Sequence, residues 1–305
     1  MFHFASACLR LLLLASLAGC SIEGYAIDNL GDALSKSGTT FASDDDPELV
    51  REAVPFSLKL IESLLAERPQ HAGLLLAAAR GFTQYSWAFV QQDAEHLEGV
   101  DLAASEHTRL RARKLYLRAR GYALRALELD HPGFETRLRA DPLATVKELG
   151  KPDVERAYWL AAAWGAALSQ GKDSPALLAD QPLVEALLDR ALLLDEGFEQ
   201  GALHTLFVSY EASRPGGARG WQERSRKHFA RAVELSKGMR AGPYVALAEA
   251  VCVQDQLRPE FTQLLERALA LDADALPAAR LENLVYQARA RWLLARSDEL
   301  FLDQP

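Results

Sequence analysis

The chain has very few cysteines, three among its 305 residues. Cys8 and Cys20 both lie in the N-terminal apolar segment, so Cys252 stands alone in the rest of the chain. A protein that loses this segment, or carries lipid on Cys20, has no cysteine pair for an intrachain disulfide. Hydrophobic residues make up 49% of the sequence, enough for a large core that needs no such cross-link.

Long apolar runs and strand-forming residues are also scarce. After the N-terminal segment no stretch approaches the roughly 18 apolar residues of a membrane span, so we expect no transmembrane helix. Val, Ile and Thr are sparse, whereas Ala, Leu, Arg and Glu dominate segments whose apolar residues recur every three to four positions. The sequence therefore predicts an all-α protein.

The common motifs of catalysis are missing as well. There is no glycine-rich phosphate loop, no HExxH zinc motif and no GxSxG nucleophile motif. We therefore expect a protein that is not an enzyme and that holds no cofactor. The formal net charge of -8 argues against nucleic acid as a partner, because an acidic surface repels phosphate.

Metal ligands are thinly spread. The densest group is His96 and His107 together with three nearby carboxylates. Carboxylate and imidazole suit zinc or manganese. The two histidines are eleven positions apart, however, and Gly99 interrupts the helix that would align them. We interpret the group as a solvated polar helix end and predict no metal site.

The N-terminus carries a short apolar run that stops at a cysteine. Residues 1–19 have a basic Arg10 and an apolar stretch too short to span a bilayer, which is typical of a secretory signal. Leu17-Ala18-Gly19-Cys20 resembles the bacterial lipobox, in which the cysteine becomes the acylated first residue. We predict lipid on Cys20, and Ser21 favours the outer membrane with the body facing the periplasm. A plain signal peptide is the alternative.

The remaining chain reads as a tether and one helical domain. Residues 20–46 are expected to hold the lipidated end, a short helix at 28–37 and a polar linker. Residues 47–305 form a single helical repeat domain. Its expected helices are 47–68, 70–98, 102–130, 153–168, 182–194 and a capping helix at 278–300, with an insertion at 131–151.

A short fragment recurs within this domain. Arg125-Ala-Leu-Glu-Leu-Asp130 reappears in similar form at 190–195, 231–236 and 267–272, with offsets of 65, 41 and 36 residues. The last two offsets lie near the period of about 34 residues of tetratricopeptide helix pairs. The fragment matches the end of the second helix of such a pair, where a small residue lets two helices approach closely. We predict an α-solenoid of degenerate tetratricopeptide-like pairs with a concave binding face.

Aromatic and polar side chains supply candidates for the lining of a groove or pore. Tyr and Trp combine an apolar body with a polar tip, which suits such a wall. The alternative for each is packing between repeats. The candidates are Gln84, Tyr85, Trp87, Tyr158, Trp159, Trp164, Tyr210 and Tyr244.

A basic run on one expected helix supplies a candidate docking strip for an acidic partner. Its members are Arg109, Arg113, Lys114 and Arg120. The alternative, which we favour, is an exposed face whose charges are balanced by Glu106 and Glu128.

The body of the chain resembles the T component associated with tripartite ATP-independent periplasmic (TRAP) transporters, the TatT lipoprotein family. The resemblance is carried, in order, by FASDDDPELVREAVPFSLKLIESLLAERP, YSWAFVQQDAE, RARKLYLRARGYALRALELDHPGF, AYWLAAAWGAALS, DRALLLDEGFEQGALHTLFVSYE, SKGMRAGPYVALAE and RLENLVYQARARWLLAR. These segments cover most of the chain between Cys20 and Phe301.

The resemblance implies a lipid-anchored, periplasm-facing homotrimer with a channel through or beside each subunit. It implies association with the periplasmic substrate-binding protein of a TRAP transporter, and a small apolar or organic-acid ligand. We therefore expect a non-enzymatic accessory of solute uptake. The alternative is a general tetratricopeptide-type scaffold lipoprotein in envelope assembly.

Overall fold

The computed structural model describes residues 29–35, 38–214 and 219–302. In these parts every regular element is a helix, which confirms the all-α prediction. The predicted signal segment 1–19 and Cys20 lie outside the described residues. Among the described helices, none combines the length and the apolar composition that crossing a membrane requires.

The polar linker forms the N-terminal cap of the first long helix. Residues 29–35 are helical, as predicted, and the short α2 (Gly38–Ala42) follows. Helix α3 (Pro47–Glu67) then begins at the predicted proline. The Asp46 carboxylate accepts hydrogen bonds from two backbone amides of the first turn, at 3.1 and 3.0 Å. This acceptor satisfies amides that have no partner within the helix.

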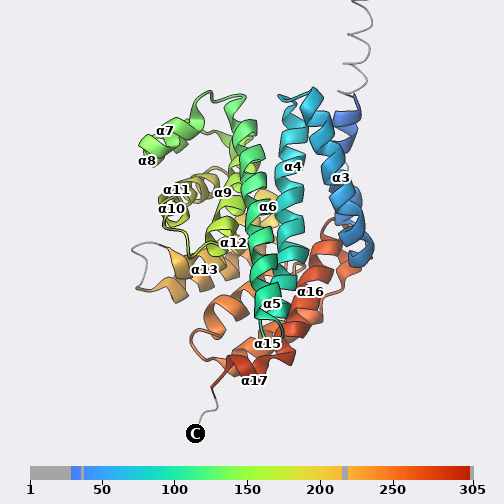
Figure 1. Ribbon diagram of the computed structural model, residues 1–305. Helices are drawn as coiled ribbons and strands as arrows, with labels where there is room; N and C mark the ends of the chain where they lie inside the picture. Colours follow the sequence, from blue (N-terminus) through green and yellow to red (C-terminus); the bar gives the residue numbers. More distant parts are fainter. Residues whose placement is uncertain (1–28, 36–37, 215–218, 303–305) are drawn as a thin grey trace, which may run out of the picture.

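Two long antiparallel stretches form the first helix pair (Figure 1). Helix α4 (Ala72–Tyr85) continues through a π-helical segment, η1 (Ser86–Gln91), into α5 (Gln92–Leu97). Helix α6 (Leu102–Glu128) returns beside them. Both predicted helices are confirmed, with small shifts at their ends. The π-helical segment was not predicted, and such segments occur frequently at functional sites.

The predicted insertion separates the first pair from the second. It holds α7 (Phe134–Ala140), α8 (Pro142–Thr145), η2 (Val146–Glu148) and η3 (Lys151–Asp153). The second pair is α9 (Val154–Ser169) and α11 (Gln181–Leu194), with the short α10 (Pro175–Leu178) in their connection. Both helices of this pair occupy their predicted positions.

Two further pairs complete the series. The third is α12 (Ala202–Tyr210) and α13 (Trp221–Leu235), flanked by the 3₁₀ turns η4 (Phe198–Gln200) and η5 (Glu211–Ser213). The fourth begins with α14 (Gly242–Leu247) and a second π-helical segment, η6 (Ala248–Cys252), and returns in α15 (Arg258–Leu269). Cys252 is fully buried in it.

The predicted last helix is divided in two. The 3₁₀ turns η7 (Ala273–Ala275) and η8 (Pro277–Ala279) precede α16 (Arg280–Ala295), and α17 (Ser297–Leu300) follows after a break at Arg296. The break leaves α16 to pack against the fourth pair while α17 turns away at the end of the molecule (Figure 1).

The recurring sequence fragment carries a buried alanine in each pair. It lies at the C-terminal end of α6, α11, α13 and α15, which is the second helix of its pair in every case. The alanine of each copy has no exposed surface; these are Ala126, Ala191, Ala232 and Ala268. A buried alanine lets helix axes approach closely, so the fragment has the packing role predicted for it.

Helix α16 also closes the series on itself. Besides the fourth pair, it contacts α2 and α3, so the first and last parts of the domain lie side by side (Figure 1). The Arg280 guanidinium donates to the backbone carbonyl of Ser43 at 3.0 Å. The predicted all-α, solenoid-like fold is confirmed, and α16, which was expected only to cap the series, also bridges to its start, so that the helices form a ring.

Candidate functional site

The ring is closed by one buried arginine. Arg289 of α16 is 9% exposed and donates to Glu95 of α5 at 2.7 Å and to both carboxylate oxygens of Glu249 of η6, at 2.8 and 2.6 Å. Burial opposes its charge, but the two carboxylates hold the pKa of Arg289 above its usual value. The guanidinium therefore stays charged and joins the first helix pair to the last.

Polar and aromatic contacts extend this junction. Glu95 also accepts from Gln91 at 2.9 Å, and Gln91 accepts from the Tyr116 hydroxyl at 2.7 Å. The rings of Trp87 and Tyr286 have centroids 4.6 Å apart. Both π-helical segments thus contact α16. Segment η1 does so through Trp87, and η6 does so through the ion pair between Glu249 and Arg289.

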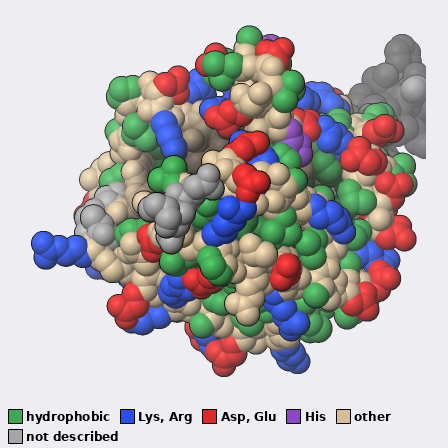
Figure 2. Space-filling view, turned by 90° about the horizontal axis from the view of Figure 1, so that it is seen from below, with side chains coloured by type: hydrophobic (Ala, Val, Ile, Leu, Met, Phe, Trp, Pro, Cys, Tyr) green, Lys and Arg blue, Asp and Glu red, His purple; other side chains and the backbone are tan. Residues whose placement is uncertain are grey.

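A pocket of about 770 Å³ opens beside the junction. Its walls come from α5, the first half of α6, the loop after α9, η6, α16 and α17. Arg289 and Trp292 lie on one wall, and Arg109 and Arg113 lie on another. Figure 2 views this end of the molecule and shows charges of both signs mixed with hydrophobic side chains. The volume is in the range of small-molecule sites.

Two members of the predicted basic strip, Arg109 and Arg113, line this pocket, and the other two do not. Arg109 lies 3.4 Å from Glu98, and Arg113 donates to Asp173 at 2.7 Å. Lys114 is exposed and faces outward. The two pocket arginines are thus balanced by acidic residues other than the Glu106 and Glu128 that were expected.

Arg120, the last member of the strip, points into the protein. Its guanidinium carbon lies 3.9 Å from the ring centroid of Trp164 and its charge is paired with Glu135. Burial lowers the pKa of Arg120 from its usual value. Arg120 is therefore unavailable to a partner. The prediction included it because the sequence of a helix does not reveal which of its cations faces inward.

Side chains from five segments of the ring converge on its interior. We call Trp87, Tyr158, Glu199, Arg240, Glu282 and Tyr286 the inner cluster. They come from η1, α9, η4, the loop before α14, and α16. Arg240 donates to Glu282 at 2.6 Å and its Nε lies 3.4 Å from the Gln200 side-chain oxygen.

The inner cluster is partly accessible to solvent, because Glu199 is exposed and the other members are half-buried. Burial raises the pKa values of Glu199 and Glu282 above their usual range, and burial likewise raises those of Tyr158 and Tyr286. Glu282 nevertheless keeps 36% of its side-chain surface accessible.

Glu199 sits on a strained backbone. Glu199, Gln200 and Gly201 have φ values of 42°, 58° and 94° in succession. The left-handed region disfavours residues with a side chain, so the surrounding structure must hold Glu199 there. A Cβ at Gly201 would lie 3.2 Å from the Ala232 Cα, which also requires glycine.

The predicted groove residues separate into three groups. Trp87 and Tyr158 belong to the inner cluster. Gln84 is exposed, and Tyr85 is half-buried with its ring 5.6 Å from that of Phe89. Tyr210 is half-buried, with its ring 6.0 Å from Phe207.

The other three predicted groove residues belong to the hydrophobic core. Trp159, Trp164 and Tyr244 are 4%, 0% and 7% exposed. Trp164 is covered on one side by Arg120 and lies 5.5 Å from the Arg139 guanidinium. For these three, core packing replaces the expected groove lining.

Sequence reasoning missed the polar members of the site. Glu199, Arg240 and the pair on α16, Glu282 and Arg289, lie in three separate segments of the chain and match no motif. One signal was present, since residues 282, 286, 289 and 292 recur at helical spacing and therefore share a face of α16. Within the described residues, no group of three His, Cys, Asp or Glu side chains is placed to hold a metal ion.

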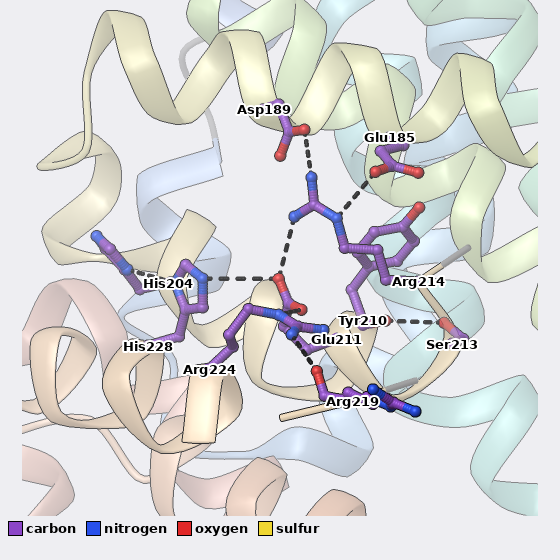
Figure 3. A network of polar contacts seen from close by, with 10 residues as sticks. All are labelled: Glu185, Asp189, His204, Tyr210, Glu211, Ser213, Arg214, Arg219, Arg224 and His228. Atoms are coloured by element: carbon purple, nitrogen blue, oxygen red, sulfur yellow. Dashed lines mark hydrogen bonds and ion pairs between the residues drawn. The ribbon is translucent and has the colours of Figure 1, made fainter. Parts of the chain in front are cut away.

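A second polar network braces the middle of the ring (Figure 3). Glu211, only 1% exposed, accepts from Arg214 at 3.1 Å and also pairs with Arg224. Arg214 in turn donates to Glu185 of α11 at 2.8 Å and pairs with Asp189. The network ties the second pair to the third.

A histidine pair extends this network. The Nδ1 atoms of His204 and His228 lie 2.8 Å apart, and the His228 ring stacks on Phe207 with centroids 4.7 Å apart. Burial, aided by the neighbouring His204, lowers the pKa of His228 to about 4. His228 is therefore neutral near neutral pH.

Acid is expected to weaken the fold through His228. Between about pH 7 and about pH 5 its depressed pKa should reduce the free energy of unfolding by roughly 2 kcal/mol. In this window the unfolded chain, with a histidine pKa near 6.5, binds a proton that the folded protein excludes. Urea unfolding at both pH values measures the loss, which should be smaller for His228→Gln. Equal losses in the two proteins would contradict the assignment.

Comparison with known proteins gives two matches. The family model described as TRAP transporter T-component matches residues 43–301. A protein of Treponema pallidum (strain Nichols), described as an uncharacterized protein, is 31% identical over 304 residues, which is 94% of each chain. Both matches extend over the whole ring of helices.

Proposed function

Because the chain belongs to the TRAP transporter T-component family, we propose that it binds the periplasmic substrate-binding protein of a TRAP uptake system as a non-enzymatic accessory. The observation that carries this proposal is the extent of the family match, from the linker before α3 to Phe301. It includes every helix pair and both walls of the pocket. The proposal includes a small solute bound within the ring. The family resemblance implies that this solute is apolar or an organic acid.

The chemistry of the pocket supports binding over catalysis. Arg289 and the two pocket arginines are each paired with a carboxylate, so their charges are already balanced within the protein. Paired charges among apolar side chains suit a surface that another molecule covers. For the docking strip, Arg109, Arg113 and Lys114 remain candidates.

The proposal places the protein at a membrane by its N-terminus. Lipid on Cys20 would tether it, and Ser21 favours the outer membrane. Assembly into a homotrimer is proposed on the family resemblance. Light scattering of a soluble Cys20→Ser form would measure the number of copies.

Capture from detergent-solubilised membranes tests the partner. The tagged protein should retain the substrate-binding protein of a TRAP transporter, identified by mass spectrometry, while Cys20→Ser should move to the soluble periplasmic fraction. Lys114→Glu should weaken capture if the strip docks the partner. Lys227→Glu is the matched control, because Lys227 is exposed on α13 and lies outside the strip. Retention of envelope-assembly factors in place of the binding protein would contradict the proposal.

A further inference from the structure

Helix α6 carries a long basic segment in an acidic protein. Seven arginine and lysine residues lie between positions 107 and 127, and no aspartate or glutamate does. The whole chain has a formal net charge of -8, so this segment is opposite in sign to the protein that carries it. A surface with one sign of charge attracts partners of the other sign and speeds their association.

Two of these cations are left without a counter-charge. The other five are held by acidic side chains or, in one case, by a backbone carbonyl; they are Arg109, Arg113, Arg118, Arg120 and Arg125. Arg111 and Lys114 are exposed and form no ion pair with any residue that the structure describes. They are three positions apart and therefore neighbours on one face of the helix. Solvent thus meets two adjacent free cations on α6.

Exposed hydrophobic side chains lie beside these cations. Leu110 is adjacent to Arg111, four positions from Lys114, and 44% exposed. Val100, in the turn before α6, and Leu102, its first residue, are 84% and 61% exposed. We call these five residues the outer α6 surface. Apolar side chains that gather on one surface and are bordered by polar ones mark sites of protein interaction.

Helix α6 presents different charges to the pocket and to the outside. The pocket side holds Arg109 and Arg113, whose charges are balanced by the acidic partners described above, and also Glu106. Arg111 and Lys114 do not line the pocket, and Leu110 lies at its edge. The uncompensated positive charge therefore belongs to the outer α6 surface.

Two other occupants fit this surface less well. Anionic membranes are recognised by clusters of about 4–8 lysines and arginines, and two free cations fall short of that number. A second copy of the chain that paired through the same surface would place like charges against each other. A protein partner with acidic side chains meets neither objection.

We propose that the outer α6 surface docks the substrate-binding protein through an acidic patch with an apolar centre. Carboxylates of the partner pair with Arg111 and Lys114, and its apolar side chains cover Val100, Leu102 and Leu110. This inference rests on the proposed function, for which it names the docking surface and the chemistry of the partner's side. It adds Arg111 and the three hydrophobic residues, which the predicted strip did not include.

Binding between purified proteins tests the surface. The soluble Cys20→Ser form is immobilised, and binding of the same organism's TRAP substrate-binding protein is measured by biolayer interferometry over a range of salt concentrations. Affinity should fall as salt rises, because salt screens exposed charges. Arg111→Glu combined with Lys114→Glu should weaken binding at low salt by at least about tenfold and remove this salt dependence. Leu110→Ser should weaken binding by about fivefold at every salt concentration.

Matched variants separate the surface from general effects of charge and hydrophobicity. Lys147→Glu combined with Lys227→Glu makes the same change of charge on other elements, η2 and α13, where both lysines are exposed. Leu193→Ser removes an equally large side chain that is 77% exposed on α11. Both should leave binding unchanged. Urea unfolding should be the same for all variants, since each altered side chain is exposed.

The outcomes distinguish this inference from the proposed function. If the starting protein binds and the Arg111 and Lys114 double variant binds equally well, the inference is overturned while the proposed function stands. If the starting protein does not bind, both are overturned. With partner binding unchanged, two further results would reassign the surface and overturn the inference. One is loss of sedimentation with phosphatidylglycerol vesicles, and the other is a change in the number of copies by light scattering.

Discussion

Replacing Arg289 with methionine is expected to lower the free energy of unfolding by about 3–5 kcal/mol. The guanidinium is buried between Glu95 and Glu249, and its removal leaves two carboxylates without their counter-charge. Urea unfolding of the soluble Cys20→Ser form measures the loss. Hydrogen exchange should accelerate in α16 and η1, because these elements meet at the junction that closes the ring.

Two comparisons isolate the buried pair. Arg226→Met breaks an equally direct pair with Glu260, but both side chains are more than a third exposed, so the loss should be at most about 1 kcal/mol. Adding Glu95→Gln and Glu249→Gln to Arg289→Met should restore much of the stability, since no charge is then left unpaired. Similar losses for Arg226→Met and Arg289→Met would refute the closing role.

Replacing Trp164 with alanine should cost about 3–5 kcal/mol of unfolding free energy. Trp164 is fully buried in the core shared by α4, α6, α9 and α11. The change leaves a cavity and removes the ring against which Arg120 lies. Thermal and urea unfolding both report the loss.

Phe56 provides the matched aromatic control. Its side chain on α3 is 74% exposed, and Phe56→Ala should change the unfolding free energy by no more than about 0.5 kcal/mol. If Trp164→Ala also proved nearly neutral, Trp164 would have to be restored to the groove lining.

The fold could be predicted from sequence because its signals are local. Helix periodicity, the proline that opens α3 and the recurring Arg-Ala fragment each depend on a few neighbouring residues. The buried alanines Ala126, Ala191, Ala232 and Ala268 show that the fragment encodes the contact between paired helices. No local sequence pattern predicts that the ring closes, because closure depends on how the small rotations between successive helix pairs add up.

The site could be predicted only in part because it is assembled from distant segments. Trp87 and Trp164 are the same residue type on similar helices. Only the arrangement of the helix pairs leaves Trp87 half-buried in the inner cluster and places Trp164 in the hydrophobic core. A left-handed backbone conformation places Glu199 in the inner cluster, and no pattern in the neighbouring sequence predicted that conformation. Arg289 lies in a helix that was expected simply to cap the series.

The bridge made by α16 has a consequence for how the protein matures. A ribosome delivers the chain N-terminus first, so the first helix pair emerges long before the segment that must seal it. Until α16 has been synthesised, Glu95 has no counter-ion from Arg289 and Trp87 has no Tyr286 to cover it. Closing this junction joins residues almost two hundred positions apart, so a chain interrupted before α16 would leave it open to proteases.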